Sequence, residues 1–102
     1  MIIYNVTLKV NNEVADKWVA WMKATHMKDL MNTGLFTDCR LCRLLNNAEP
    51  EDDGSTFTAQ YCCDSMEQYN EYIDKHADRL REDMLKLFAG KFVAFRTLME
   101  TV

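Results

Sequence analysis

The hydrophobic pattern of this chain switches between a period of two and a period of about 3.6 residues, and this switching restricts its fold more than any other feature. Residues 2–10 alternate between apolar and polar side chains, and the apolar side holds Tyr4, Val6, Leu8 and Val10. Such alternation predicts a strand that buries one face.

A helical period follows, up to about Thr33. Asn11 or Asn12 offers a side-chain oxygen to cap the start of this helix, and Gly34 supplies a left-handed end. Two overlapping apolar rows mark its buried side, one formed by Val14, Trp18, Trp21, Met22 and Thr25, the other by Ala15, Val19, Met22 and His26.

Two strand-like runs, residues 35–45 and 55–63, occupy the middle of the chain. The polar stretch between them, residues 46–54, holds the only proline and ends in Asp-Gly. It is typical of an exposed hairpin loop. We expect its acidic run, residues 51–53, to be a solvated loop tip.

A second helical period follows, marked by an apolar row from Tyr69 to Phe88. Asp64 with Glu67, or Ser65 with Gln68, has the spacing of a capping box at its start. Its apolar row contains Tyr69, Tyr72, Ile73, His76, Leu80, Met84, Leu87 and Phe88. Gly90 ends the helix, and residues 91–100 alternate as a last strand.

The element order is therefore βαββαβ in one domain, residues 1–102. Two βαβ units joined by a hairpin predict an α+β, ferredoxin-like plait: a four-stranded antiparallel sheet with two helices on one face. We expect the uncovered face to hold Ile3, Asn5, Thr7, Asp38, Arg40, Cys42, Leu44, Thr58, Gln60, Cys62, Phe92, Ala94, Arg96 and Leu98. Because this face mixes apolar residues with arginines, we predict that it pairs with a second copy in a homodimer.

Composition argues against several classes of protein. The net charge is −4, so we expect no nucleic-acid partner, which would call for a basic excess. No apolar run approaches the length of about 18 residues that spans a bilayer, and residues 1–6 lack the marks of a signal peptide. We expect a cytoplasmic protein without a membrane partner.

The four cysteines, Cys39, Cys42, Cys62 and Cys63, invite a zinc or disulfide interpretation. On a strand, however, residues three apart and neighbouring residues point to opposite faces, so four thiolates cannot converge on one metal. Cytoplasmic thiols also stay reduced. We expect no metal site, and four free thiols that pack as small apolar side chains.

Several motifs resemble an uncharacterised family of small bacterial proteins, known only as a domain of unknown function. They are Trp18-x-x-Trp21-Met22-x-x-x-His26, Thr33-Gly34-x-Phe36, Tyr61-x-Cys63-Asp64-Ser65, His76-Ala77-x-x-Leu80-Arg81 and, most specific, Gly90-Lys91-Phe92-Val93-Ala94-Phe95-Arg96. The resemblance covers nearly the whole chain. It implies a place in the dimeric α/β-barrel superfamily, which includes small cofactor-free monooxygenases, haem-degrading enzymes and chlorite dismutase-like proteins, and it supplies no activity.

A haem-degrading relative would place an iron-ligating histidine on the second helix, an asparagine on the first strand and a tryptophan near the third. His76 has the right helix, but Asn5 points away from the helices and both tryptophans lie on the first helix. We therefore expect no haem and no other cofactor.

His26, His76 and Arg96 are the catalytic candidates. An imidazole at His26 or His76 can act as a base near neutral pH. A contact at the helix end is the more common explanation for a histidine placed like His26, and a core position for one placed like His76. Arg40, Arg43 and Arg96 lie among apolar strand residues. Such arginines clamp a carboxylate or phosphate, or pair with Asp38, Glu100 or a dimer mate.

Trp18, Trp21 and Tyr61 are the candidate ligand-binding residues. Because Trp18 and Trp21 are three residues apart, one is expected to pack on the sheet and the other to line a pocket. Two functions stay open: a small-molecule-binding homodimer, with the cofactor-free monooxygenase type as its enzymatic form, or a non-catalytic dimeric regulatory or interaction module. No nucleophile–base pair or carboxylate pair identifies a reaction.

Overall fold

The computed structural model describes residues 1–46 and 53–102, so most of the predicted hairpin loop, including residues 51 and 52 of its acidic run, lies outside the described residues. The elements are β1 (Ile2–Asn11), α1 (Asn12–Trp21), a π-helical stretch η1 (Met22–His26), α2 (Met27–Met31), β2 (Asp38–Arg43), β3 (Gly54–Cys63), α3 (Met66–Lys75), α4 (Ala77–Phe88) and β4 (Phe92–Glu100). The predicted βαββαβ order is confirmed.

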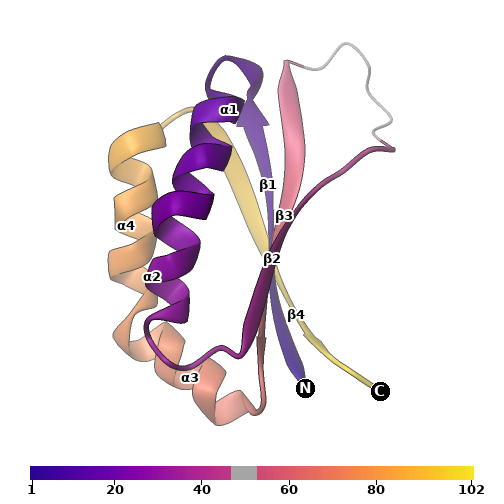
Figure 1. The fold of residues 1–102 in the computed structure, drawn as a ribbon, viewed down its shortest axis with the longest axis vertical. Coiled ribbons are helices and arrows are strands. Elements are labelled where there is room, and N and C mark those ends of the chain that lie inside the picture. Colours follow the sequence, from indigo (N-terminus) through magenta and orange to yellow (C-terminus); the bar gives the residue numbers. More distant parts are fainter. Residues whose placement is uncertain (47–52) are drawn as a thin grey trace.

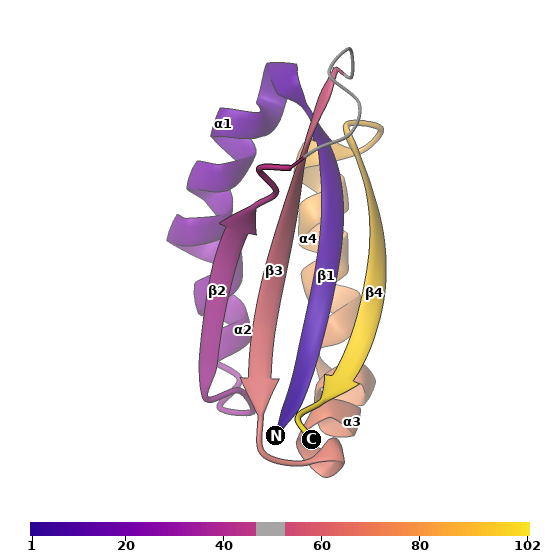
Figure 2. The ribbon, with the colours of Figure 1, turned by 90° about the vertical axis from the view of Figure 1, so that its right-hand side faces the viewer.

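The sheet has the strand order β2-β3-β1-β4, and every neighbouring pair is antiparallel. All helices lie on one side of it, as Figure 1 shows. Seen from the other side, the sheet has no covering layer (Figure 2). This is the predicted ferredoxin-like arrangement.

The core lies between the sheet and the helices. Tyr4, Val6, Leu8 and Val10 alternate along β1 and are almost fully buried, as their period of two predicts. Their partners from β3 and the helices complete one apolar cluster that includes Phe57, Ala59, Tyr61, Trp18, Met22, Leu30, Leu80, Met84 and Phe88.

The predicted facing of β4 is wrong by one residue. Val6 pairs with Arg96 and Val10 with Phe92, and directly opposed residues share a face. Phe92, Ala94, Arg96 and Leu98 therefore lie on the helix side, and the open face holds Val93, Phe95, Thr97 and Met99 instead. The strand is apolar on both sides, so its alternation alone cannot select a face; pairing with β1 does.

The first helical segment contains five π-helical residues, Met22–His26, where the backbone N–H of Met27 donates to the carbonyl of Met22. Because the π-helical turn contains about one residue more than an α-helical turn, the buried positions that follow are shifted by about one residue along the chain. Thr25, predicted on the apolar row, is exposed, whereas His26, Met27 and Leu30 are buried.

Local signals at the helix ends have mixed outcomes. Ser65 and Gln68 form the predicted capping box, and Gly34 and Gly90 have the positive φ angles (77° and 75°) expected of helix-ending glycines. Asn11 occupies the first cap position but makes no side-chain cap bond. The second helical region is broken at His76, whose φ of −128° separates α3 from α4.

Within the described residues, no helix combines the length and the apolar character needed to cross a membrane.

Candidate functional site

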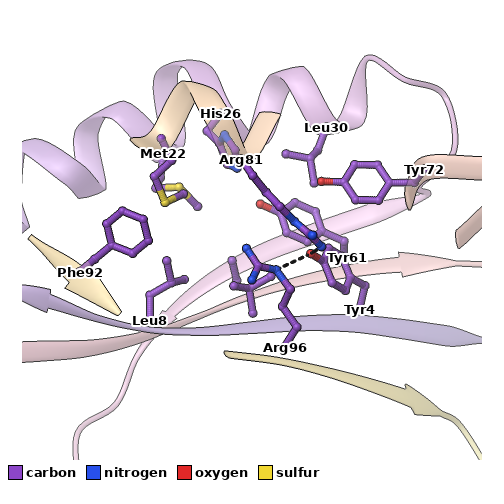
Figure 3. Close-up of a pocket in the computed structure, with 13 residues that line it drawn as sticks. Tyr4, Leu8, Met22, His26, Leu30, Tyr61, Tyr72, Arg81, Phe92 and Arg96 are labelled. Carbon is purple, nitrogen blue, oxygen red and sulfur yellow. Dashed lines mark hydrogen bonds between the residues drawn. The ribbon is translucent and has the colours of Figure 1, made fainter. Parts of the chain in front are cut away.

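A cavity lies between the helix-facing side of the sheet and the helices (Figure 3). Most of its walls are apolar, but six polar side chains reach it, each from a different element. These are Tyr4 of β1, His26 of η1, Tyr61 of β3, Tyr72 of α3, Arg81 of α4 and Arg96 of β4, and the full lining adds Val6, Leu8, Met22, Leu30, Ala59, Met84 and Phe92.

The hydroxyl of Tyr4 lies between two guanidinium groups. Arg81 Nη2 donates to Tyr4 Oη at 3.2 Å, and Arg96 Nε donates to the same oxygen, also at 3.2 Å. Figure 3 shows Arg81 reaching down from the helix layer and Arg96 reaching up from the sheet. Tyr4 itself is only 2% exposed, so the strand positions its ring firmly under both cations.

Arg81 keeps its charge in this setting. Burial is the largest single effect and lowers its pKa, but the hydrogen bond to Tyr4 and the electrostatic effects of the neighbouring tyrosines together outweigh burial, so the pKa is raised. Its Nε is buried and has no hydrogen-bond partner among the described residues. A buried donor of this kind leaves an unmet hydrogen bond at the cavity wall.

His26 is a neutral imidazole at physiological pH. Burial lowers its pKa to about 4, against the opposing effect of the carboxylates Asp29 and Asp83. Its ring stacks on Trp21 at 4.9 Å between centroids, and its Nδ1 is buried without a partner in the described part of the chain. A neutral ring with an unused nitrogen can accept or donate one hydrogen bond in the cavity.

Tyr61 and Tyr72 remain phenols rather than phenolates. Burial, reinforced by neighbouring tyrosines, raises both pKa values well above the ordinary range. Their rings belong to an aromatic cluster around Tyr4, with centroids 6.0 Å and 5.7 Å from the Tyr4 ring. Such packing fixes the rings that form one wall of the cavity.

The enclosed space measures about 40 Å³, enough for about three water molecules. Among the lining residues Arg96 is the exposed one, and Arg81 and Phe92 are half-buried. The opening therefore lies between α4 and β4. A small polar group fits inside, and a larger molecule extends toward this opening.

The candidates from the sequence are distributed unevenly around this cavity. His26, Tyr61 and Arg96 line it. Trp18 is fully buried and packs on Phe57 at 5.0 Å. Trp21 contacts the cavity only through its stacking on His26. Of the two tryptophans, one thus packs on the sheet, as expected.

His76 lies outside the cavity, because the helix breaks there. It borders a separate hollow between α2 and α4 together with Asp29, Arg79 and Asp83, and its Nδ1 lies 3.3 Å from Arg79 Nη2.

The strand cysteines and the other two arginines lie on predicted faces. Cys39 shares the helix side with Tyr61, whereas Cys42 shares the open face with Thr58. Arg43 lies over the Phe57 ring at 5.2 Å, and Arg40 is exposed on the open face. Within the described residues, no group of three or more histidines, cysteines or carboxylates has a metal-binding arrangement.

Sequence reasoning did not select Tyr4, Tyr72 or Arg81 as site residues. A signal for Arg81 was available, because it lies four residues after Ala77 and three before Met84, on the same helical face as the apolar row. The two tyrosines give no such signal, since a buried tyrosine in an apolar row also fits an ordinary core.

Solved structures with this fold are distant in sequence. A dimeric ferredoxin-like protein from an uncultured marine organism is 14% identical, with a TM-score of 0.71 over 99% of this chain and 96% of that chain. An ethyl tert-butyl ether d (ethd) family protein from Bacillus halodurans is 13% identical, with a TM-score of 0.67 over the full length of both chains. A monooxygenase from the gene ActVA-Orf6 of Streptomyces coelicolor, in complex with Nanaomycin D, is 17% identical, with a TM-score of 0.60 over 99% and 88%.

At these identities the likeness concerns the fold alone. No curated protein matches the sequence. One family model does match, from residue 1 to residue 102, in agreement with the resemblance of the sequence motifs. The chain therefore belongs to the family described as domain of unknown function DUF4286.

Proposed function

We propose that this protein is a homodimer that binds a small molecule in the cavity between the sheet and the helices. The observation that carries the proposal is the group of unused polar atoms at the cavity wall. His26 Nδ1 and Arg81 Nε are both buried and unpaired within the described residues. Buried polar groups normally have partners, and a bound molecule supplies them here.

A thermal-shift screen with small metabolites tests binding. A ligand specific for the folded state, at a hundred times its Kd, stabilises the protein by about 2.7 kcal/mol. The matched variants are Ala59→Leu, which fills the cavity, and Ala20→Leu, which adds the same volume at an exposed position of α1 outside the lining. The stabilisation should disappear in Ala59→Leu and persist in Ala20→Leu. If no compound stabilises the wild type, the non-catalytic interaction module is the better description.

Two of the structures with this fold carry the name monooxygenase, so oxygen-dependent turnover of a bound molecule is the form of catalysis to test first. His26 is the lining residue best suited to remove a proton from such a molecule, because it is neutral at pH 7. If His26 is the catalytic base, the variant His26→Gln should still bind a compound found in the screen. It should no longer consume oxygen in the presence of that compound.

The open face of the sheet supports the dimer. Val93, Phe95 and Met99 of β4 are 68%, 63% and 38% exposed, next to the half-buried Ile3 of β1. Four strands of about nine residues make a face of roughly 570 Å², so two copies bury about 1,100 Å², near the lower end of stable interfaces. Two of the similar structures are described as dimeric ferredoxin-like proteins.

Sedimentation velocity measures the assembly directly. We expect a dimer for the wild type and a monomer for Phe95→Glu, because the substitution places a charge in the apolar face. Leu85→Glu is the matched control, since Leu85 is 48% exposed on the outer surface of α4. A monomeric wild type, or a dimer that survives Phe95→Glu, would contradict an interface on this face.

A further inference from the structure

The charge inside the cavity is unbalanced. Its lining includes two guanidinium groups, Arg81 and Arg96, and no aspartate or glutamate. In the described ranges neither arginine has a carboxylate in ion-pair contact; their recorded partner is the hydroxyl of Tyr4. Two adjacent cations that share one neutral acceptor repel each other, and an anion between them would relieve that repulsion.

The unused donors converge with this charge. A guanidinium has five N–H groups, and each arginine uses one of them on Tyr4. Tyr4 Oη accepts both of these bonds, so what its hydroxyl still offers is its own proton. No acceptor for that proton lies within the described residues. The cavity thus offers donors and positive charge to a group that accepts hydrogen bonds.

The cavity walls narrow the choice of anion. The space of about 40 Å³ accommodates a carboxylate more readily than a tetrahedral, doubly charged phosphate. Most of the remaining lining is apolar and includes Met84 and the half-buried Phe92. Arginine also matches the planar geometry of a carboxylate.

We propose that the cavity binds the carboxylate of a small organic acid, with its oxygens against Arg81, Arg96 and the Tyr4 hydroxyl and its apolar body toward the opening between α4 and β4. This inference rests on the proposed function, because it names the class of molecule that the cavity takes up. His26, which like Arg81 comes from the helix layer, is a further polar group of the cavity wall.

NMR of protein with isotope-labelled histidine tests the proposal at the site itself. The chain has two histidines, so the variant His76→Gln identifies the His26 signal. The probes are acetate and benzoate, their neutral counterparts acetamide and benzamide, and inorganic phosphate. We expect both compounds to be compared through the Kd at which they shift the His26 signal, and benzoate to bind at least about tenfold more tightly than benzamide. A tenfold ratio of Kd values is the typical effect of one charge-assisted hydrogen bond.

Variants connect the binding to the two cations. Arg96→Gln and Arg81→Gln should each weaken benzoate binding at least about tenfold and leave benzamide binding almost unchanged. Arg79→Gln is the matched control, because Arg79 lies on the same helix but borders the other hollow. Folding of each variant is checked by its circular dichroism spectrum, and Arg96→Gln keeps the test valid if Arg81→Gln does not fold.

Proton coupling gives a second measurement. His26 faces Trp21 on α1, Asp29 on α2, and Asp83 and Arg81 on α4. A carboxylate bound in the same cavity adds a negative charge, so benzoate should raise the apparent pKa of His26, whereas benzamide should not.

The outcomes separate this inference from the proposed function. If benzamide binds as tightly as benzoate, small-molecule binding stands and the acid class is wrong. Phosphate binding tighter than benzoate, or benzoate binding that survives both arginine variants, also overturns the carboxylate site. If no probe shifts His26, the acid class fails, and the metabolite screen with Ala59→Leu decides separately whether the cavity binds any molecule.

Discussion

The two faces of the sheet differ sharply, although each is built from the same four strands. On the helix side, Phe57 is 2% exposed and packs under Trp18. On the open side, Phe95 is 63% exposed. The helix side is almost entirely apolar along β1 and β3, whereas the open face has polar residues there, such as Asn5 and Gln60, and has most of its apolar residues on β4. The two phenylalanines thus differ in burial because the helix layer covers one of them, and the apolar open side of β4 stays accessible.

The largest expected effect compares these two phenylalanines. Phe57→Ala should lower the free energy of unfolding by about 3–5 kcal/mol, because it opens a cavity in the core. Phe95→Ala should lower it by less than about 1 kcal/mol in dilute, monomeric protein, as for an exposed site. Urea unfolding at several protein concentrations measures both. Equal losses at every concentration would mean that the open face is packed within one chain.

Acid should destabilise the folded protein through His26, which is buried between the helices and the covered side of the sheet. Its pKa of about 4 in the folded protein lies below the ordinary value of about 6.5 in the unfolded chain, so the unfolded state binds more protons between these values. The contribution of neutral His26 to the free energy of unfolding is fully present above about pH 6.5, and it is lost as the pH falls toward 4. The loss reaches about 3 kcal/mol at most.

Urea unfolding between pH 7 and 4 measures this slope. His26→Gln should flatten the slope in this range, and the matched control His76→Gln should retain it, because His76 lies outside the cavity. A wild-type slope that survives His26→Gln would assign the acid sensitivity to other groups.

The cysteines give a smaller comparison across the same two faces. Cys42 is exposed on the open face, whereas Cys63 is fully buried on the helix side and burial raises the pKa of its thiol. We expect a thiol reagent to modify Cys42 more than about tenfold faster, since the thiolate is the reactive form. Peptide mass spectrometry after timed labelling measures both rates.

The protein concentration sharpens this test. If the open face forms the dimer interface, labelling of Cys42 should slow as the protein is concentrated, and labelling of Cys63 should not. Equal rates for the two thiols in dilute protein would show that the helix layer opens as easily as the uncovered face.

Most of the fold could be predicted from the sequence, because the alternation of β1 and β3 and the helix-end signals at Ser65, Gly34 and Gly90 agree with one another. The sequence does not reveal which residues of β4 face the helices and which lie on the open face. Phe92 and Phe95 are both large and apolar and lie on opposite sides, so the decision depends on hydrogen bonds to β1, such as the one from Asn11 N to Lys91 O at 2.9 Å.

The site was predicted less completely than the fold. His26, Tyr61 and Arg96 were selected because their side chains carry recognisable chemistry. The convergence of Arg81 and Arg96 on Tyr4 spans 92 residues of sequence, and no local pattern encodes a contact of that range. It arises only when the sheet register and the position of α4 are both fixed.

The π-helical stretch, Met22–His26, is equivalent to an α-helix with one residue inserted. The insertion changes the helix locally while the segments on either side, α1 and α2, keep their packing on the sheet. Deleting the exposed Ala24 would return this stretch to α-helical winding and move His26 relative to the cavity without replacing any cavity residue. A change of chain length by a single residue would therefore alter the shape of the cavity while conserving the fold.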